Sequence, residues 1–126
     1  MCGIVGVIKR DPSLPDNVIQ TLKHRGPDSD GIFQENNVFL GHTRLSILDL
    51  SERAAQPMLS TDGQYVIVFN GEIYNHIDIR RKLQRDFIFR SDSDTETVLN
   101  AFIKYGSECL NHFNGIFAFA IYNRTS

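Results

Sequence analysis

The sequence lacks the features that mark membrane, secreted and nucleic-acid-binding proteins. No apolar run approaches the roughly 20 residues that are needed to span a bilayer. The first eight residues are apolar, but no basic segment precedes them and charged residues follow at once, so no signal peptide is expected. Lysine and arginine number 13 against 15 acidic residues, which argues against a basic face for nucleic acid. We therefore expect neither a membrane nor a nucleic acid as a partner.

Cysteines and metal-binding patterns are also scarce. Cys2 and Cys109 are too few for a disulfide framework, and the expected location is a reducing cytoplasm. The four histidines do not group with one another or with the cysteines at metal-ligand spacing, so no metal site is expected. No glycine-rich phosphate loop of the GxxxxGKS, GxxxxGKT or GxGxxG type occurs either.

A chain of 126 residues suffices for one hydrophobic core, and its apolar pattern predicts both strands and helices. Strands are predicted at 3–8, which should be buried on both faces, and at 31–35, 38–42, 44–50, 64–69 and 115–122. Asn36-Asn37 and Asp62-Gly63 lie between apolar segments and predict two hairpin turns. Strands that come first in the chain, followed by helices, predict an α+β domain of packed sheets with helices outside.

Three helices are predicted from apolar residues at helical spacing. The first begins near Pro15, carries its apolar residues at 18, 19 and 22, and stops at Gly26-Pro27. The others are expected at about 76–86 and 95–105, with Asn75 and Asp94 as their caps.

Cys2 is the first candidate for chemistry. A thiol is an intrinsically good nucleophile with a pKa near 8.5, and a free α-amine has a pKa near 7.7–8.0. If Met1 is removed, Cys2 carries both groups, so the amine can take the thiol proton and later protonate a leaving group. The following Gly3 would let the backbone approach a substrate closely. The alternative is that Cys2 is a small buried hydrophobe.

Asn70-Gly71 follows the strand predicted at 64–69. Between apolar segments this pair usually forms a turn. Its other use is electrostatic, because an amide side chain and an unhindered backbone N–H can both point at one developing oxyanion. The residues alone favour the turn.

Arg44 and Asp94 are candidates for binding opposite charges. Arg44 lies in an otherwise apolar segment after His42, and its planar guanidinium suits a carboxylate. Asp94 could receive a substrate ammonium group, so the two together would suit an α-amino acid. A salt bridge for Arg44 and a helix cap for Asp94 explain them about as well.

Five spaced motifs connect these separate signals. They are MCGIVG at 1–6, RGPD at 25–28, GHTRLSILD at 41–49, FNGEIYN at 69–75 and SDTE at 93–96. In their residues and their order they closely resemble the N-terminal glutaminase domain of asparagine synthetases. That domain belongs to the class II (N-terminal nucleophile) glutamine amidotransferases. The resemblance covers the whole chain, 1–126, and implies a four-layer αββα sandwich.

The resemblance implies a role for each matching residue. Cys2, exposed by removal of Met1, would be the nucleophile, and Asn70 and Gly71 would form the oxyanion hole. Arg44 would bind the carboxylate of glutamine, and Leu45 and Ile47 would add neighbouring backbone contacts. Glu72 and Asp94 would hold the amino group.

The resemblance also implies that glutamine is hydrolysed to glutamate and ammonia. In the family the ammonia passes to a synthetase domain of the same chain, which this sequence lacks and to which ATP and magnesium would belong. No cofactor is therefore expected in this segment. Related enzymes that make amino sugars, phosphoribosylamine or amidated sugar acids share the chemistry. The residues of the FNGEIYN and RLSILD motifs favour asparagine synthesis.

The end of the sequence suggests that the domain is incomplete. The apolar strand predicted at 115–122 is followed by only four residues, whereas the family's domain continues with further strands. We therefore expect a truncated domain whose last strand could associate with another copy. A non-catalytic remnant that only binds glutamine is the alternative hypothesis.

Overall fold

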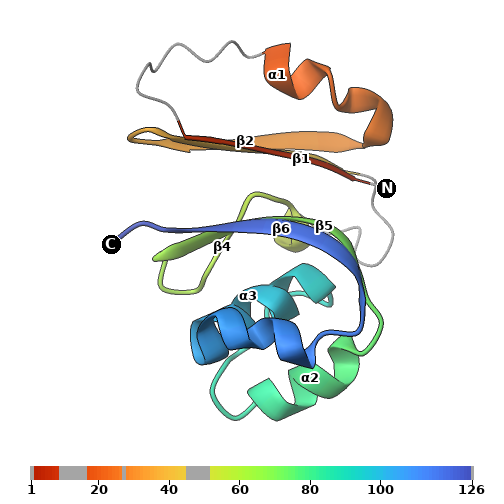
Figure 1. Ribbon diagram of the computed structural model, residues 1–126, viewed down its shortest axis with the longest axis vertical. Coiled ribbons are helices and arrows are strands. Elements are labelled where there is room, and N and C mark those ends of the chain that lie inside the picture. The colour runs from red at the N-terminus through yellow and green to blue at the C-terminus, as the bar shows by residue number, and fades with distance from the viewer. Residues whose placement is uncertain (1, 9–16, 27, 45–51, 126) are drawn as a thin grey trace.

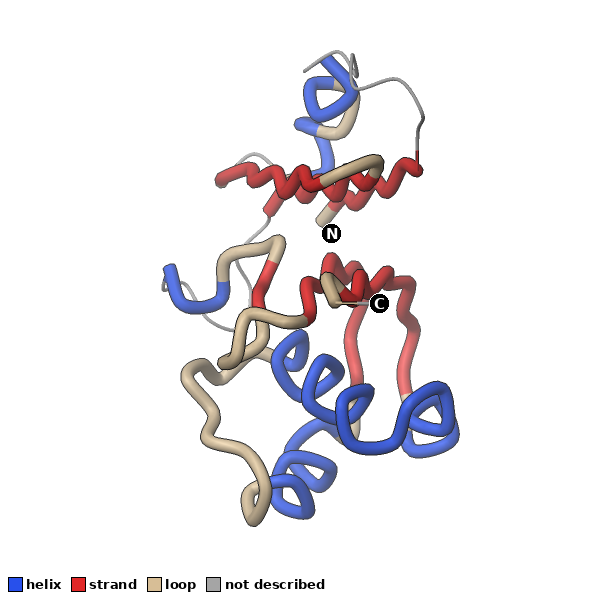
Figure 2. The backbone as a smooth tube through the Cα atoms, turned by 90° about the vertical axis from the view of Figure 1, so that its left-hand side faces the viewer, coloured by secondary structure: helices blue, strands red, loops and turns tan. Residues whose placement is uncertain are grey.

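The computed structural model describes residues 2–8, 17–26, 28–44 and 52–125, and it has four layers (Figure 1). Two antiparallel three-stranded sheets lie face to face, and helices cover the outer face of each sheet. Figure 2 shows the same layering from the side, with the helices at the two ends of the stack. The predicted αββα sandwich is confirmed.

The first sheet, sheet A, contains β1 (Gly3–Ile8), β2 (Ser29–Glu35) and β3 (Val38–Arg44) in the order β1-β3-β2. β2 and β3 form the predicted hairpin, in which Asn36 adopts a left-handed conformation at φ 54°. Outside this sheet lie α1 (Asn17–Gln20) and η1 (Lys23–Arg25). The central strand β3 is the most buried strand of the sheet because both of its edges are paired and α1 packs on it.

The second sheet, sheet B, contains β4 (Met58–Leu59), β5 (Tyr65–Ile73) and β6 (Gly115–Asn123) in the order β4-β5-β6. The short 3₁₀ helix η2 (Glu52–Ala54) precedes it. On its outer face lie α2 (His76–Leu83), α3 (Asp94–Tyr105) and η3 (Gly106–His112). Because β4 has only two residues, it pairs with the first part of β5, and no other described strand pairs with the rest of that edge (the open edge of β5).

Two apolar clusters hold the layers together. The larger one lies between sheet B and its helices and is built around Ile67, Leu83 and Val98. The smaller one lies between the sheets, where Leu40 packs against Val66 and Val68. Alternate residues of β5 therefore enter different clusters, which follows from the two-residue period of a strand.

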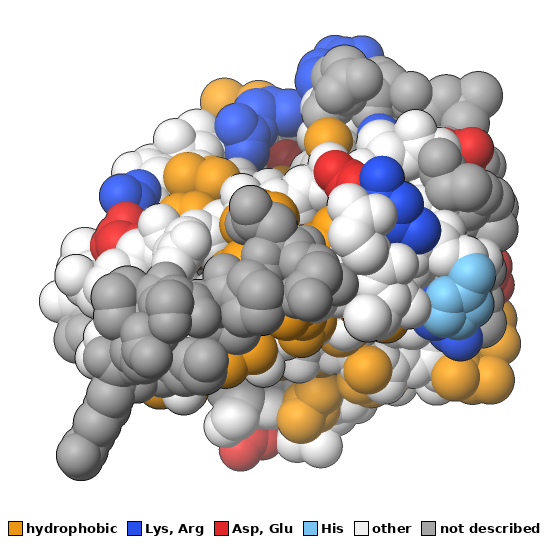
Figure 3. All heavy atoms as spheres, turned by 90° about the horizontal axis from the view of Figure 1, so that it is seen from above, with side chains coloured by type: hydrophobic (Ala, Val, Ile, Leu, Met, Phe, Trp, Pro, Cys, Tyr) orange, Lys and Arg blue, Asp and Glu red, His pale blue; other side chains and the backbone are white. Residues whose placement is uncertain are grey.

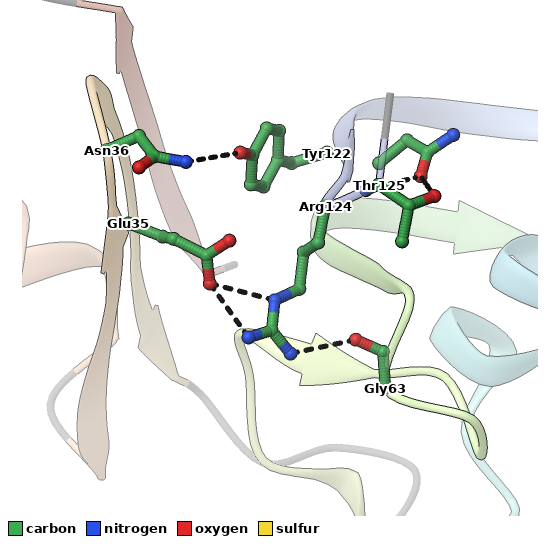
Figure 4. Close-up of polar contacts among 7 residues, drawn as sticks. Glu35, Asn36, Gly63, Tyr122, Arg124 and Thr125 are labelled. Atoms are coloured by element: carbon green, nitrogen blue, oxygen red, sulfur yellow. Dashed lines mark hydrogen bonds and ion pairs between the residues drawn. The ribbon is translucent and has the colours of Figure 1, made fainter.

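Polar contacts join the two sheets at the end where β2 and β6 finish (Figure 4). The Arg124 guanidinium contacts the Glu35 carboxylate at 2.8 Å, and it also donates to the carbonyl of Gly63. Asn36 donates to the Tyr122 hydroxyl beside this pair. These contacts fix sheet A against sheet B at the end of the sandwich away from the start of β1.

The structure corrects three sequence predictions. The strand at 3–8 is not buried on both faces, because β1 is an edge strand and Ile8 is 86% exposed. Asp94 is not the cap of α3: Ser93 is, and its side chain accepts from the N–H of Thr95. The helix η3 follows α3 directly and was not predicted, since the helical segment was expected to end at about residue 105. Of the strand predicted at 44–50, only Arg44 lies within the described residues.

Candidate active site

Cys2 and Arg44 lie at the same end of sheet A. β1 and β3 pair antiparallel with Gly3 opposite Thr43, so the next position places Cys2 beside Arg44. Arg44 lies on the face of β3 that carries Leu40, which packs between the sheets. Cys2 is half-buried, and its carbonyl accepts from Nε of Arg25 at 3.3 Å, while Arg44 is buried.

Asn70 lies on the facing strand, β5. It shares the inter-sheet face with Val66 and Val68, and both β1 and β3 pack against β5. Its Oδ1 atom is buried and has no hydrogen-bond partner within the described part of the chain. An unsatisfied buried amide is unusual and points to a partner that is supplied by a ligand or by a small side-chain rotation.

The open edge of β5 beyond β4 presents a row of backbone N–H groups. Ser60 N–H donates to the Tyr65 carbonyl, so the odd-numbered residues of β5 direct their backbone groups to this edge. Phe69 N–H is already bound by Oε1 of Gln56 at 2.6 Å, and Ile73 N–H is bound by Oδ2 of Asp94 at 3.1 Å. Gly71 lies between them, so strand alternation directs its N–H to the same edge.

Gly71 has a backbone that only glycine accepts here. Its φ is +143°, and a Cβ atom would lie 2.1 Å from the carbonyl oxygen of Ile116. The strand thus continues through Asn70-Gly71, and the turn that this pair usually indicates does not form. Asn70 projects between the sheets and the Gly71 N–H lies at the open edge, an arrangement that suits a developing oxyanion.

Asp94 lies at the first position of α3 and is buried. Burial raises the pKa of its carboxyl group above the usual range, whereas the hydrogen bond from Ile73 N–H and the nearby His76 act in the opposite direction. A buried carboxylate of this kind gains from a cation that shares its site. Glu72, also predicted to bind the substrate amine, is exposed on β5.

The segment before Asp94 is held by two charged side chains. Arg80 of α2 donates to the carbonyls of Ser91 and Ser93. Glu96 accepts from the N–H groups of Arg90 and Ser91 and from the Ser91 hydroxyl. These hydrogen bonds fix the backbone of residues 90–93, which leads directly into Asp94.

The predicted residues that the structure describes fall into two groups, apart from Glu72, which is exposed on β5. Cys2 and Arg44 are brought together by sheet A, and Asn70, Gly71 and Asp94 by the edge of β5. Leu45 and Ile47 lie outside the described residues. The sequence did not identify Gln56 as a functional residue, because nothing distinguishes it from the other polar residues around it. The sequence also indicated no role for His42.

The described residues offer no alternative metal centre or membrane span. Among them no three His, Cys, Asp or Glu side chains gather in a way that could hold a metal ion. In the same ranges no helix is long and apolar enough to cross a membrane. Seen from the side of sheet A, charged side chains of both signs are scattered among apolar ones (Figure 3).

The sequence matches known proteins over its whole length. The family model of the glutamine amidotransferase domain matches residues 1–126. The glutamine-hydrolysing asparagine synthetase 1 of Bacillus subtilis is 42% identical over 98% of the chain, and asparagine synthetase B of Escherichia coli is 39% identical over 98%. The chain spans only 21% and 23% of the lengths of these two relatives.

A solved structure has a similar fold. The glutamine phosphoribosylpyrophosphate amidotransferase of B. subtilis, determined with ADP and GMP, aligns with a TM-score of 0.60 at 22% identity. The alignment covers 72% of this chain and 22% of the other. At this identity the likeness supports the sandwich fold alone.

Proposed function

Because the chain belongs to the family of glutamine amidotransferase domains, we propose that it hydrolyses the side-chain amide of glutamine with Cys2 as the nucleophile. The observation that carries the proposal is the open edge of β5. In this proposal the Asn70 amide, which projects between the sheets, and the Gly71 N–H at that edge stabilise the oxyanion, and the N–H groups on either side of Gly71 are occupied by Gln56 and Asp94. An active site of this type needs donors that are fixed in place before the charge develops.

The reaction needs only groups that Cys2 and its surroundings supply. After removal of Met1, the α-amine of Cys2 takes the thiol proton, and Sγ forms a bond to the amide carbon of glutamine. The carbonyl oxygen becomes an oxyanion, which accepts from the Asn70 amide and the Gly71 N–H. The protonated amine then gives its proton to the nitrogen, the C–N bond breaks and ammonia leaves. Water attacks the resulting thioester, which releases glutamate and restores the thiol.

Charged residues on β3 and at the start of α3 hold the substrate in this proposal. Arg44 binds the α-carboxylate of glutamine, assisted by the backbone at Leu45 and Ile47. Asp94, with Glu72 nearby, binds the α-ammonium group, which compensates the burial of the Asp94 carboxylate. The distance between the two charges then selects an amino acid whose side-chain amide reaches Cys2.

We propose that the ammonia serves the amidation of a carboxylate, as the names of the asparagine synthetase relatives suggest. That step requires a synthetase segment, and ATP with magnesium would bind there and not in residues 1–126. The acceptor is aspartate in this proposal, and amidation of a sugar acid by the same chemistry is the competing outcome. Self-association through β6 remains a prediction.

Alkylation by a glutamine analogue tests the proposal directly. The intact mass first establishes whether Met1 has been removed. The electrophile 6-diazo-5-oxo-norleucine should then label Cys2 and spare Cys109, which is 1% exposed and whose thiol pKa is raised by burial. Labelling of Cys109 alone, in folded protein that lacks Met1, would contradict the proposal. A protein that binds glutamine but neither reacts nor releases glutamate would be a non-catalytic binding module.

Two substitutions separate substrate binding from catalysis. Removing one partner of a buried charge pair costs about 2–5 kcal/mol, so Arg44→Ala should weaken glutamine binding severely. Asn70→Ala should instead lower kcat by roughly 10²–10³-fold, because its bond strengthens as the oxyanion forms. Arg81→Ala is the matched control, since Arg81 is exposed and its ion pair among the described residues is with Asp78 on its own helix. A change in KM alone for Asn70→Ala would refute the oxyanion assignment.

A further inference from the structure

His42 is a buried histidine whose ring makes no full hydrogen bond to the residues that the structure describes. It is 1% exposed, and within the described ranges neither Nδ1 nor Nε2 has a hydrogen-bond partner. Leaving a buried polar group unsatisfied is costly, so a structure that keeps one usually uses it. The imidazole must therefore satisfy its N–H at another stage of the protein's work.

His42 lies on β3 close to the end of sheet A that carries Cys2 and Arg44. It lies two residues before Arg44 on the same face of β3 and pairs in register with Ile4 of β1. The backbone of Phe69 on β5 acts on the His42 ring as a hydrogen-bonding group and raises its pKa, although the contact does not reach the geometry of a full hydrogen bond. His42 thus reaches across the layer between the sheets to the residue that precedes Asn70.

Asn70 lacks a hydrogen-bond donor among the described residues, whereas His42 lacks an acceptor. Its Oδ1, an acceptor, is buried without a partner, and its side chain projects from β5 into the layer that His42 enters from β3. An asparagine can aim its N–H₂ group at an oxyanion only if the opposite end of the amide, Oδ1, points away. A donor behind Oδ1 would therefore select the productive orientation of the amide.

We propose that His42 is a positioning residue for Asn70: its ring N–H donates to Oδ1 of Asn70 when an oxyanion draws the amide N–H₂ group toward Cys2. This proposal rests on the proposed function of Asn70. Both side chains enter the layer between the sheets, and the bond would give the His42 ring and the Asn70 Oδ1 atom the hydrogen-bond partners that they lack within the described part of the chain. His42 itself does not touch the substrate.

The ionisation of His42 agrees with a role as a neutral donor. Burial, with the positive charge of Arg44 in support, lowers its pKa from 6.5 to about 4. At neutral pH the ring therefore carries one N–H and no charge. A cationic ring in the same position would compete with Arg44 for the negative charge of the substrate.

Substitutions of His42 test this role by kinetics. In the intact protein, His42→Phe keeps the ring volume but removes the donor, and glutamine hydrolysis should lose roughly tenfold in kcat with little change in KM. His42→Gln restores an N–H donor and should recover part of the loss. His112→Phe, at an exposed position of η3, is the control for the same chemical change. A loss that appears in KM, or equal activity of the Phe and Gln variants, would overturn the proposal.

A measurement on the unsubstituted protein covers the case in which His42→Phe does not fold. Protein labelled with ¹⁵N-histidine is compared by NMR before and after Cys2 is alkylated with 6-diazo-5-oxo-norleucine, whose carbonyl occupies the oxyanion site. We expect one ring N–H of His42 to become protected from exchange and to shift downfield. Complete alkylation of Cys2 with an unchanged His42 signal would overturn the positioning role alone. Absence of alkylation would overturn the proposed function as well.

Discussion

Substitution of Gly71 by alanine is the sharpest test of the backbone conformation of β5 at Asn70-Gly71 and of its close packing against β6. The new methyl group would lie 2.1 Å from the carbonyl oxygen of Ile116 and 2.6 Å from Cα of Phe117. Both are backbone atoms of β6, the strand that pairs with β5, so neither can move without distorting the sheet. The substitution also forces a side chain onto a residue with φ +143°.

The destabilisation has two parts. A non-glycine residue in this conformation costs roughly 1–3 kcal/mol. Forcing an extra carbon into a packed contact costs typically about 1–3 kcal/mol more. Gly106→Ala separates the two parts, because Gly106 also has a positive φ of +62° but no atom within 4 Å of the added Cβ. We therefore expect Gly71→Ala to be less stable than Gly106→Ala by about 1–3 kcal/mol.

Urea unfolding followed by circular dichroism measures this difference. Both variants should unfold with the m value of the unsubstituted protein, so that the midpoints report stability. If the free energies of unfolding of the two variants agreed within about 0.5 kcal/mol, the close packing of β5 against β6 at Gly71 would be wrong. A Gly71→Ala protein of unchanged stability would likewise refute the extended positive-φ backbone.

Two further predictions concern pH and the far end of the sandwich. The pKa of His42 falls from 6.5 to about 4 on folding, so the unfolded state binds more protons between these two pH values. The free energy of unfolding should therefore decrease as the pH falls from 6.5 to about 4, by roughly 3 kcal/mol at most. Thermal unfolding at pH 7, 5.5 and 4 checks this, and an equal pH dependence in His42→Gln would refute it. Arg124→Ala removes the contact with Glu35 and should lower stability by about 1 kcal/mol, less at high salt, whereas Arg81→Ala should change it little. A larger effect at high salt would contradict the ionic origin.

The features that sequence could predict are the local ones. The hairpins at Asn36-Asn37 and Asp62-Gly63 follow from residues that accept tight turns between apolar segments. The helix that begins at Asp94 follows from its apolar spacing, although a serine at 93 and an aspartate at 94 are both good caps. In the structure Ser93 takes the cap because Asp94 is committed to the N–H of Ile73, a contact between residues 21 positions apart.

The parts that sequence could not predict depend on contacts between layers. Gln56 reads as one polar residue of a loop, and only the fold places its Oε1 at Phe69 N–H and its Nε2 at the Thr95 hydroxyl. His42 reads as an isolated polar residue in an apolar strand. Its missing hydrogen bonds become visible only when the facing strand is in place.

The open edge of β5 also explains why Asn70-Gly71 forms no turn. A turn would direct the Gly71 N–H into its own hydrogen bond, whereas an extended strand leaves it at the edge. An open edge normally attracts other strands. Here Gln56 and Asp94 occupy the N–H groups on either side of Gly71, so a continuous strand cannot pair along this stretch, while a single oxygen atom still has access. The same two side chains thus protect the edge and leave the Gly71 N–H between them for the oxyanion that we propose.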